Sequence, residues 1–446
     1  MPAANRAAQA GEGQISSFEI YSNYNEPVDV ASGCIKLDYY ESILDNTVRA
    51  TATFSDTGFR FGKEGSASVE KDGINLTAGE KVHLKIRDGN QFPLNFVDDK
   101  QLRIEEVRNI DESTNNIVFT IDLHSKESID NGVVENFVKQ RFDGKISDTV
   151  EKILKENLKT PKELDIDATL NSLSILPITD KQRGKPFYEC TWLGPRSVPD
   201  IENAKSILAG FLFYETYDGF KFKSIDKLFN KDAKKKYIFN NVIGEVPDGY
   251  DGKILDYTFD STLNLSNVLL SGSQTSAEMR VGNFYESAFR KNTFSSASQF
   301  SETNTGGKEQ PLIAADLKIQ EKTTRISYKW DDPGFLVQGK NLIEQLKKST
   351  YINYNNDEIL RQSYMRYNNL FSIKLSVAIA GDMSLRAGDI IHCDFPEISD
   401  KKNTLVSQKK SGVYMIVDVC HHLTKNSCYT RMNLVRESIG RKPAKM

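Results

Sequence analysis

Two cysteines and two histidines near the C-terminus have the side chains best suited to metal chemistry in this sequence. They are Cys420, His421, His422 and Cys428, and thiolates and imidazoles are the usual ligands of zinc. The segment alternates like a strand, so Cys420 and His422 point to one face and His421 to the other. With a turn at residues 425–426, Cys428 joins the side of His421. The four groups then do not surround one tetrahedral ion, and the pattern favours ordinary strand residues over a metal site.

No other motif indicates catalysis. Gly-Gly-Lys at 306–308 lacks the spacing and the strand–loop–helix context of a phosphate-binding loop, no Gly-x-Ser-x-Gly motif occurs, and no two carboxylates stand out as a glycosidase pair. Trp192, expected in a loop over residues 190–195, could anchor a partner, but packing into its own core is favoured. We therefore predict no catalytic, cofactor-binding or metal-binding residue, no cofactor and no enzymatic activity.

The composition indicates a folded chain with several domains. Its 446 residues suggest about three domains, and 39% hydrophobic residues suffice for sizeable cores. The 58 basic and 61 acidic residues nearly cancel, which argues against a dedicated binder of nucleic acid or membrane surfaces. No apolar run reaches the roughly 18 residues of a membrane helix, and the start lacks the apolar core of a signal peptide. The five scattered cysteines indicate reduced thiols in a protein made in the cytosol.

Short strands are predicted over the first part of the chain, because Val, Thr, Tyr and Phe recur between Gly and Asp-Gly breaks. The middle of the chain mixes helices and strands. Residues 145–158 predict an amphipathic helix with Ser147 as N-cap, and Pro161 prevents its continuation. The other elements expected up to residue 225 are a flexible tail over 1–14, strands at Phe18–Tyr21, Cys34–Tyr39 and Val48–Phe54, a helix over 200–209, and a hairpin of Phe211–Thr216 and Phe220–Ile225 turning at Asp218-Gly219.

Strands resume in the second half of the chain. Apolar residues at 371, 373, 375, 377 and 379 alternate without a break, which predicts a half-buried strand. Residues 291–310 are rich in Ser, Thr, Asn and Gly and predict a long exposed loop. The remaining expected elements are strands at Ile254–Phe259 and Asn267–Gly272, helices at Lys340–Lys348 and Asp357–Tyr367, strands up to about Val435, and a basic tail over Arg436–Met446.

The sequence contains a weak internal repeat. Residues 75–86, NLTAGEKVHLKI, align with residues 384–395, SLRAGDIIHCDF. In both copies a Gly followed by an acidic residue predicts a turn, and alternate apolar residues then face one side of a strand. His83 and His392 occupy the same position. They could form a matched pair at an interface, but the off-core face of a strand is favoured.

The similarity continues in the same order downstream. Ile104–Val107 matches Ile416–Val419, a polar turn and a strand follow in each copy, and Glu127-Ser128-Ile129 matches Glu437-Ser438-Ile439. We infer that one β module is present twice. A trimer of such a chain presents six modules in a ring and can join a threefold object to a sixfold one. Duplication without any role in symmetry is the alternative.

These features resemble the baseplate hub proteins of contractile-tailed, T-even-like bacteriophages, and the related hub domains of spike proteins in contractile secretion systems. The resemblance covers the layout of nearly the whole chain. It rests on Glu41-Ser42-Ile43, the Val48–Phe54 strand and Asp56, Leu-x-Ala-Gly-acid at 76–80 and 385–389, Ile104–Val107 with Ile121-Asp122-Leu123, Phe142-Asp143-Gly144, and Tyr414–Val419 with Asn426–Leu434.

The resemblance implies a structural protein of the virion tail baseplate, assembled in the bacterial host cytoplasm. It implies a homotrimer that forms a pseudo-hexameric ring, with the tail tube or its initiator on one face, the trimeric spike on the other, and baseplate wedge proteins as further partners. DNA would pass through the central channel only in transit, and no membrane anchor is expected. Because a basic lining would retain DNA, we expect the lumen to be acidic or neutral on balance.

The implied fold class is mainly β with α+β insertions: two related tube-type antiparallel β-barrel domains plus two smaller α/β domains. Two other functions stay open from the sequence: a tail-associated cell-wall hydrolase with paired carboxylates in a pocket, and a carbohydrate-binding adhesin with exposed aromatic platforms. The expected division is a tail over 1–14, a first barrel over 15–128, an α+β domain over 129–236, a second barrel over 237–275 and 355–436, an inserted domain over 276–354, and a basic tail over 437–446.

Overall fold

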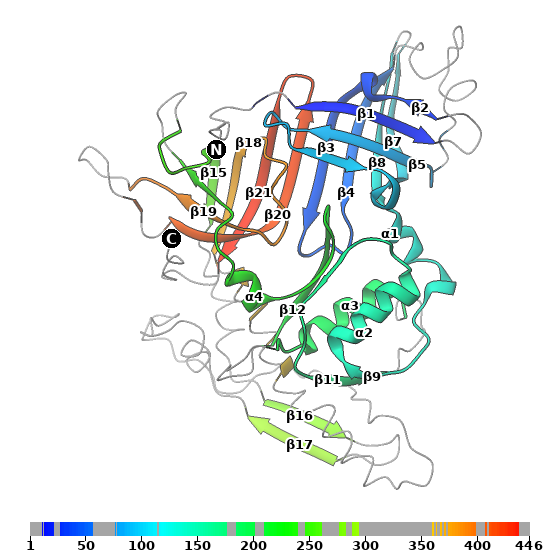
Figure 1. Cartoon of the computed structure of the whole chain (residues 1–446), viewed down its shortest axis with the longest axis vertical. Helices are drawn as coiled ribbons and strands as arrows, with labels where there is room; N and C mark the ends of the chain where they lie inside the picture. The colour runs from blue at the N-terminus through cyan, green and yellow to red at the C-terminus, as the bar shows by residue number, and fades with distance from the viewer. Residues whose placement is uncertain are drawn as a thin grey trace.

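Strands dominate the computed structural model of the chain, which confirms the predicted mainly β fold with small helical insertions (Figure 1). Within the described ranges, no helix combines the length and the apolar character that crossing a membrane requires. The structure describes residues 11, 13–21, 27–56, 76, 78–113, 116–175, 184–200, 209–239, 246–260, 276–281, 288–293, 373–397, 406–407 and 410–436, with 359, 360, 363, 366, 367, 370 and 371.

The N-terminal β-module, residues 14–125, is a curved sheet around its own apolar core. Its strand β4 (Arg49–Asp56) shows the predicted alternation, with Ala50, Ala52 and Phe54 buried and the residues between them on the opposite face. The other strands are β1 (Gln14–Tyr21), β2 (Val28–Asp29), β3 (Cys34–Ser42), β5 (Lys81–Arg87), β6 (Pro93–Phe96), β7 (Leu102–Ser113) and β8 (Asn116–Ser125), with 3-10 turns at Ala31–Gly33 and Asp98–Lys100.

The C-terminal β-module is a closed barrel, in which β19, β14, β15, β18, β21 and β20 follow one another and β20 pairs again with β19. β14 is parallel to both of its neighbours, while the other pairs of the barrel are antiparallel. The predicted alternating strand begins at Ile373, because Phe371 lies in a turn. The strands are β14 (Lys235–Ile238), β15 (Gly252–Asp260), β18 (Ile373–Ala380), β19 (Ile390–Asp394), β20 (Gly412–Thr424) and β21 (Cys428–Arg436).

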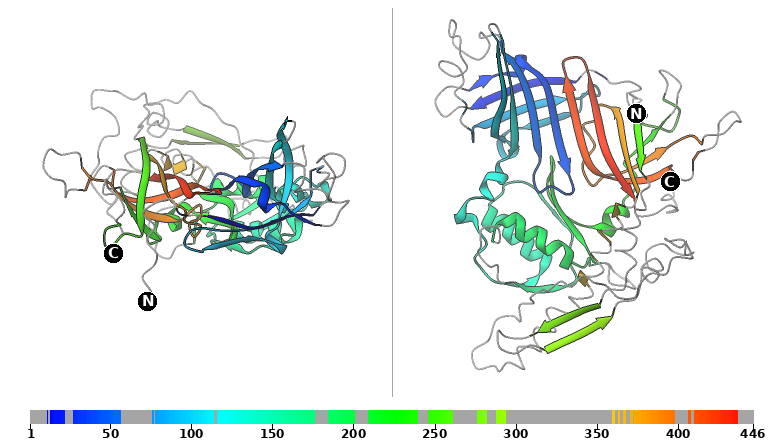
Figure 2. Two further views of the ribbon diagram at one scale, coloured as in Figure 1. Left: turned by 90° about the horizontal axis from the view of Figure 1, so that it is seen from above. Right: turned by 180° about the vertical axis from the view of Figure 1, so that it is seen from behind.

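The two modules share one continuous sheet, because β20 of the barrel pairs antiparallel with β3 of the N-terminal module. The strand order across this sheet is β15-β18-β21-β20-β3-β4-β8-β7. Figure 2 shows from behind how the C-terminal strands stand beside β4 and its neighbours. The sheet thus consists of two runs of four strands that are joined at the β3–β20 seam.

The backbone at the repeat is the same in both modules. Gly79 and Gly388 both have positive φ, at 91° and 83°, a conformation that glycine adopts without strain. The Gly79 N–H donates to the Ile104 carbonyl at 2.7 Å, and the Gly388 N–H donates to the Ile416 carbonyl at 2.8 Å. In return, the Ile104 N–H donates to the Glu80 carbonyl at 3.0 Å, and the Ile416 N–H donates to the Asp389 carbonyl at 2.9 Å. The alignment made from the sequence therefore joins equivalent atoms.

Two strand irregularities are also repeated, although β7 has a further shift between Arg108 and Asp111 that β20 lacks. The β7–β8 register shifts between Ile104 and Glu106, and the β20–β21 register shifts between Ile416 and Asp418. A second register shift follows Cys34 in the β3–β4 pair and Ile254 in the β15–β18 pair. Both shifts lie opposite the end of the paired strand, β4 or β18. A bulge adds one residue and fixes the register of a strand pair. The run β3-β4-β8-β7 is therefore equivalent, strand by strand, to β15-β18-β21-β20.

The repeated histidines lie outside the two apolar cores. The His83 ring packs against Tyr21 with the centroids 4.7 Å apart, and its Nδ1 is 3.9 Å from a Glu19 carboxylate oxygen. His392 Nε2 is 2.9 Å from the Asp394 carboxylate. Both side chains contact neighbours of their own module, as the favoured interpretation of an off-core strand face predicts.

The modules differ in one connection. β3 and β4 are joined by residues 43–48, whereas residues 261–372 separate the equivalent strands β15 and β18. In the described part of that connection, β16 (Ser276–Val281) pairs with β17 (Ala288–Thr293). Residues 291–293 of the loop predicted over 291–310 belong to this strand pair, and residues 294–310 lie outside the described residues. Residues 359, 360, 363, 366, 367 and 370 are helical, and the first five of them fall within the helix predicted over 357–367.

The middle region, residues 126–229, packs beside the sheet (Figure 1). The predicted hairpin is present, with Thr216 opposite Gly219 at its turn. The elements of the region are α1 (Lys126–Asp130), β9 (Phe142–Lys145), α2 (Ile146–Lys152), β10 (Leu164–Ile166), β11 (Ser172–Ile175), α3 (Pro186–Leu193), β12 (Phe211–Thr216), β13 (Gly219–Ser224) and α4 (Ile225–Phe229), with 3-10 turns at Val134–Asn136 and Gly194–Arg196.

The helix predicted over 145–158 is present, but its start differs. α2 continues as a π-helix over Ile153–Leu158, and its apolar stripe packs into the core of the middle region. Ser147 is not the N-cap, because the chain arrives in extended form up to Lys145 and turns helical at Ile146. The Ser147 N–H donates a hydrogen bond to the Thr169 hydroxyl oxygen at 3.0 Å.

Trp192 lies in a helix rather than in the predicted loop. Pro186 begins α3, a position where proline's fixed φ suits the first helical turn, and the helix runs through Leu193. The half-buried Trp192 ring packs against the core of the middle region, and the Arg196 guanidinium lies 3.5 Å from the ring centre. This agrees with the favoured interpretation of Trp192 as a core residue.

The ends of the described part of the chain also differ from expectation. Within the expected tail over 1–14, the Gly11 carbonyl accepts a hydrogen bond from the Cys428 N–H at 2.7 Å, and β1 already begins at Gln14. Arg436 is the last residue of β21 and donates to the Ser411 carbonyl at 2.9 Å, so it does not belong to the basic tail. The expected elements at 201–208, 267–272, 340–348 and 437–446 lie outside the described residues.

Candidate functional site: the junction between the β-modules

Polar side chains cross the β3–β20 seam on the sheet face that points away from both cores. The Ser42 hydroxyl donates to the Asp418 carboxylate over 2.5 Å. Next to it, His422 Nδ1 is hydrogen-bonded to the carboxylate of Asp38, and Lys36 lies 2.7 Å from the same carboxylate. Side-chain pairs between directly opposite residues add to the backbone ladder of a strand pair. The modules are therefore joined by side chains as well as by strand hydrogen bonds.

The four residues considered as metal ligands lie at this seam with the predicted orientation. Cys420 and His422 are on the outward face, while Cys428 packs in the core of the N-terminal module. His421 is fully buried, and its Nδ1 lies 3.0 Å from the Thr430 hydroxyl oxygen. Among the described residues, no group of His, Cys, Asp and Glu side chains is arranged to hold a metal ion.

A buried carboxylate, Glu41 of β3, joins three parts of the chain. It accepts hydrogen bonds from the Tyr217 N–H at 2.8 Å in the β12–β13 turn and from the Ala387 N–H at 3.0 Å in the second copy of the repeat. The Tyr39 hydroxyl donates a third bond at 2.9 Å. Burial raises the pKa of Glu41 above its ordinary value, although Arg386 and the three hydrogen bonds oppose this. Both modules and the middle region therefore meet at one side chain.

Arg386 supplies the positive charge of this cluster. Its Nε lies 3.8 Å from a Glu41 carboxylate oxygen and 3.4 Å from that of Asp218. The guanidinium donates to the Met383 carbonyl at 2.6 Å and lies 5.0 Å from the centre of the Tyr217 ring. A buried guanidinium is stable only when charge and hydrogen bonds compensate its lost hydration, and this arrangement provides both.

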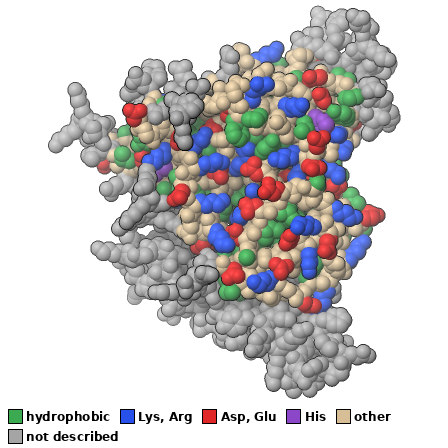
Figure 3. Space-filling view, in the orientation of Figure 1, with side chains coloured by type: hydrophobic (Ala, Val, Ile, Leu, Met, Phe, Trp, Pro, Cys, Tyr) green, Lys and Arg blue, Asp and Glu red, His purple; other side chains and the backbone are tan. Residues whose placement is uncertain are grey.

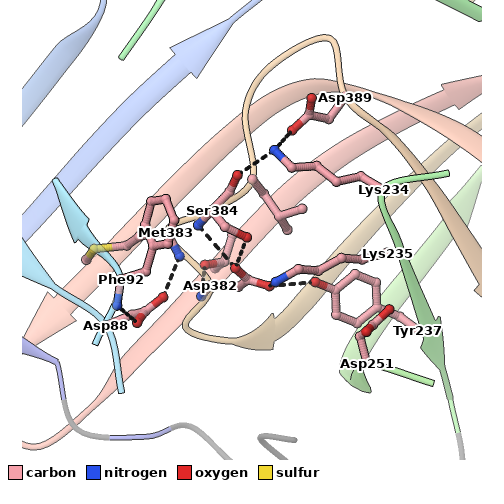
Figure 4. A network of polar contacts seen from close by, with 12 residues as sticks. Asp88, Phe92, Lys234, Lys235, Tyr237, Asp251, Asp382, Met383, Ser384 and Asp389 are labelled. Carbon is pink, nitrogen blue, oxygen red and sulfur yellow. Dashed lines mark hydrogen bonds and ion pairs between the residues drawn. The ribbon is translucent and has the colours of Figure 1, made fainter. Parts of the chain in front are cut away.

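A second network connects the end of β5 with the loop that follows β18 (Figure 4). The Asp88 carboxylate accepts a hydrogen bond from the Met383 N–H at 2.8 Å. The neighbouring Asp382 accepts from the Tyr237 hydroxyl at 2.8 Å and pairs with Lys235. Burial would raise the pKa of Asp382, but Lys235 and the hydrogen bonds outweigh it and hold the pKa below its ordinary value. The loop therefore binds the N-terminal module and β14 at once.

A buried triad of charges lies within the middle region, and one of its members also binds the N-terminal module. Lys162 Nζ lies 2.7 Å from a Glu127 oxygen and 2.5 Å from a Glu215 oxygen, and the three side chains are 4%, 2% and 1% exposed. Glu215 also accepts the Val48 N–H at 3.0 Å. Burial alone would lower the pKa of Lys162, but Glu215 and Glu127 outweigh it and raise the pKa. Burial raises the pKa of Glu215 against the charge of Lys162.

These clusters can hold the modules in place, but they are unsuited to acid–base catalysis on an external substrate. A glycosidase needs two carboxylates that a sugar can reach from both sides of the bond. Glu127 and Glu215 are enclosed and both bind Lys162, and Glu41 is satisfied by two backbone N–H groups. Their arrangement fits a structural junction.

The sequence analysis did not single out Lys162, Glu215 or Arg386. Each is a charged residue whose partner is far away in sequence, as Glu41 and Ala387 are. The feature of the sequence that could have indicated the Glu41 cluster is the second copy of the repeat. Its turn directly follows Arg386 and contacts Glu41. The resemblance named Glu41 only as part of a tripeptide motif.

We expect His421 to make stability depend on pH. Burial, and then the charge of Arg386, lower the pKa of His421 to about 3, whereas histidine in an unfolded chain titrates near 6.5. Below pH 6.5 the unfolded state therefore binds one more proton, and native stability falls as the pH falls toward 3. Between pH 7 and pH 5, urea unfolding should show the native chain losing about 2 kcal/mol more than the His421→Phe variant. Equal losses in the two proteins would contradict this assignment.

Comparison with known proteins places this fold among phage tail proteins. No protein-family model matches the sequence, and no curated protein matches it either. The solved tail protein from Neisseria meningitidis MC58 is similar over 96% of this chain and 98% of its own, with 9% identity and a TM-score of 0.50. The 43 kDa tail protein of prophage MuSo2 from Shewanella oneidensis is similar over 94% of this chain and 98% of its own, with 7% identity and a TM-score of 0.51. The predicted resemblance to phage tail proteins is thereby confirmed at the level of the fold.

Proposed function

We propose that the chain is the baseplate hub of a contractile phage tail. Three chains form a ring that joins the sixfold tail tube, or its initiator, to the threefold cell-puncturing spike, with baseplate wedge proteins outside it. The observation that carries this proposal is the pair of equivalent four-stranded runs in one sheet, because three such chains supply six equivalent runs around one axis. The protein acts as a structural adaptor without catalysis, in the tail of the virion.

The fold likeness to two phage tail proteins over almost their whole length supports this assignment. The buried junction supports it as well. A symmetry adaptor must keep its two modules in a fixed relation, since a change of angle between them would prevent ring closure. The seam and the Glu41 cluster both oppose such a change.

We propose that the outward face of the continuous sheet lines the channel. The strand register across the seam identifies the side chains that lie on this face. Charges of both signs are interspersed on it, which would let DNA pass without being held through counterion release. Figure 3 likewise shows Lys and Arg side chains interspersed with Asp and Glu on the face of the molecule that is seen in Figure 1. The charged side chains of the outward face include Lys36, Arg49, Arg108, Lys374 and Arg431, with Asp38, Glu106, Asp111, Asp122, Asp256, Asp260 and Asp418.

The proposal predicts a trimer in solution or on assembly with the spike. Multi-angle light scattering of the purified chain should give about three times the 50.3 kDa mass of one chain, alone or mixed with the trimeric spike protein. Electron micrographs should show rings with a central opening. A stable monomer under both conditions would refute the hub assignment. A cell-wall turnover assay on the same sample separates the hub from a hydrolase.

A further inference from the structure

The residues that lead into β1 cross the tip of the β20–β21 hairpin, which belongs to the other module (Figure 1). Gly11 forms an isolated antiparallel bridge with Cys428, and its carbonyl accepts the Cys428 N–H at 2.7 Å. A Cβ added to Gly13 would lie 2.7 Å from the Cys428 Cβ and 3.1 Å from Leu423 Cδ2, so the backbone of Gly13 packs directly on both residues. We name Gly11 together with residues 13–17 the entry strap.

The hairpin residues under the entry strap are core residues of the N-terminal module. Cys428 and Leu423 are fully buried and pack in that core, although both lie on strands of the barrel. Cys428 is also enclosed from the side of the loop after β18, because a Cβ added to Gly381 would overlap its sulfur. The β3–β20 seam ends at this tip, where Thr424 lies opposite Lys36. The seated tip therefore holds one end of the seam.

The entry strap itself is held weakly. None of residues 13–17 is buried, and the first buried side chain of β1 is that of Phe18. The register between β1 and β5 also shifts between Ile15 and Ser17, which interrupts the ladder at this point. Segments that bury little apolar surface open locally at a low free-energy cost. The strap can therefore separate from the hairpin while β1 stays paired from Phe18 onward.

We propose that the entry strap is a releasable latch that keeps the tip of the β20–β21 hairpin seated in the core of the N-terminal module. Displacing the strap exposes Cys428 and Leu423 and lets the seam separate from this end. The Glu41 cluster, with Glu41 opposite Val419, still holds the other end. A component that draws the start of the chain away from the hairpin would loosen the junction of the modules. The inference does not depend on the hub assignment or on the number of chains.

The Cys428 thiol reports the state of the latch. Burial raises the pKa of this thiol to about 12, and because the thiolate is the reactive form, the closed protein reacts slowly. Cys393 is the internal control. It is fully buried in the barrel core, away from the strap, and burial raises the pKa of its thiol as well.

The full chain is incubated with N-ethylmaleimide at neutral pH and at urea concentrations below the unfolding transition, and peptide mass spectrometry measures the modification of each cysteine. We expect Cys428 to react through local opening, at a rate that hardly depends on urea. Cys393 should react only through global unfolding, with a steep dependence on urea. The same steep dependence at Cys428 would overturn the proposal, and this comparison needs no variant.

Two alanine variants test the strap directly. Neither Gly11 nor Gly13 has positive φ, so an added methyl group tests space alone. Gly13→Ala overlaps Cys428 and should raise the modification rate of Cys428 about tenfold or more, with Cys393 unchanged. Gly11→Ala is the matched control, because its Cβ would lie 3.6 Å from the Gly89 Cα, an ordinary contact, and the rate should stay within about twofold. An unchanged Cys428 rate in Gly13→Ala, or an equal rise at Cys393, would refute the latch.

Discussion

Replacing Lys162 by methionine should destabilise the protein by about 3–5 kcal/mol, because it leaves Glu127 and Glu215 buried without their shared cation. The three side chains are almost fully enclosed, so water cannot replace the lost charge. The loss should become smaller at acidic pH, because burial raises the pKa of Glu215 and this carboxylate takes up a proton more readily once the charge of Lys162 is gone. Urea unfolding at pH 7 and pH 5 measures both effects.

Lys155→Met is the matched control for this experiment. Lys155 pairs with Glu151 one helical turn away, and the two side chains are 58% and 48% exposed. Exposed pairs of this kind contribute at most about 0.5 kcal/mol. A further variant, Lys162→Met/Glu127→Gln/Glu215→Gln, removes all three charges and should recover part of the stability. A loss in Lys162→Met as small as in Lys155→Met would show that the triad does not stabilise the fold.

Gly388→Ala should cost far more than Gly79→Ala, although the two glycines are equivalent in the repeat. Both have positive φ, which costs an alanine about 1–2 kcal/mol. A Cβ at Gly79 meets nothing within 4 Å, but a Cβ at Gly388 would overlap the buried Tyr214 hydroxyl oxygen. Overpacking adds about 1–3 kcal/mol. We expect about 1–2 kcal/mol for Gly79→Ala and about 3–5 kcal/mol for Gly388→Ala by urea unfolding.

Tyr214→Phe tests whether the overlap is the cause. It removes the oxygen that the new methyl group would strike, so Gly388→Ala/Tyr214→Phe should be more stable than Gly388→Ala alone. If Tyr214→Phe brings no recovery, or if both glycine variants lose the same stability, β12 does not pack on the second copy of the repeat as described. The comparison also shows where two equivalent turns have acquired different surroundings.

The parts of the fold that the sequence predicts are those set by short-range patterns. The alternation in β4 and β18, the Asp218-Gly219 hairpin and the apolar stripe of α2 each follow from neighbouring residues. The repeat was recognisable because its turn needs a glycine in the left-handed region in both copies. Equal backbone requirements preserve equal residues even where the remaining sequence has diverged.

The parts that the sequence did not predict depend on contacts between distant segments. Ser147 has the right type for an N-cap, but Thr169 takes its N–H, and the extended β9 sets the helix start at Ile146. The sequence predicts a loop around Trp192, but Pro186 begins a helix that includes it. Lys162 meets its carboxylates only when three segments come together. Charged residues of that kind resemble surface residues until the topology is known.

The unequal connections between β3 and β4 and between β15 and β18 have a consequence for how other components are oriented. In the proposed ring, the short link of residues 43–48 and the long link of residues 261–372 alternate around the same rim. A component that contacts only the equivalent strands of the two modules meets six equivalent binding positions. A component that contacts this rim meets three long links and three short ones. It can therefore bind only in orientations that differ by a third of a turn.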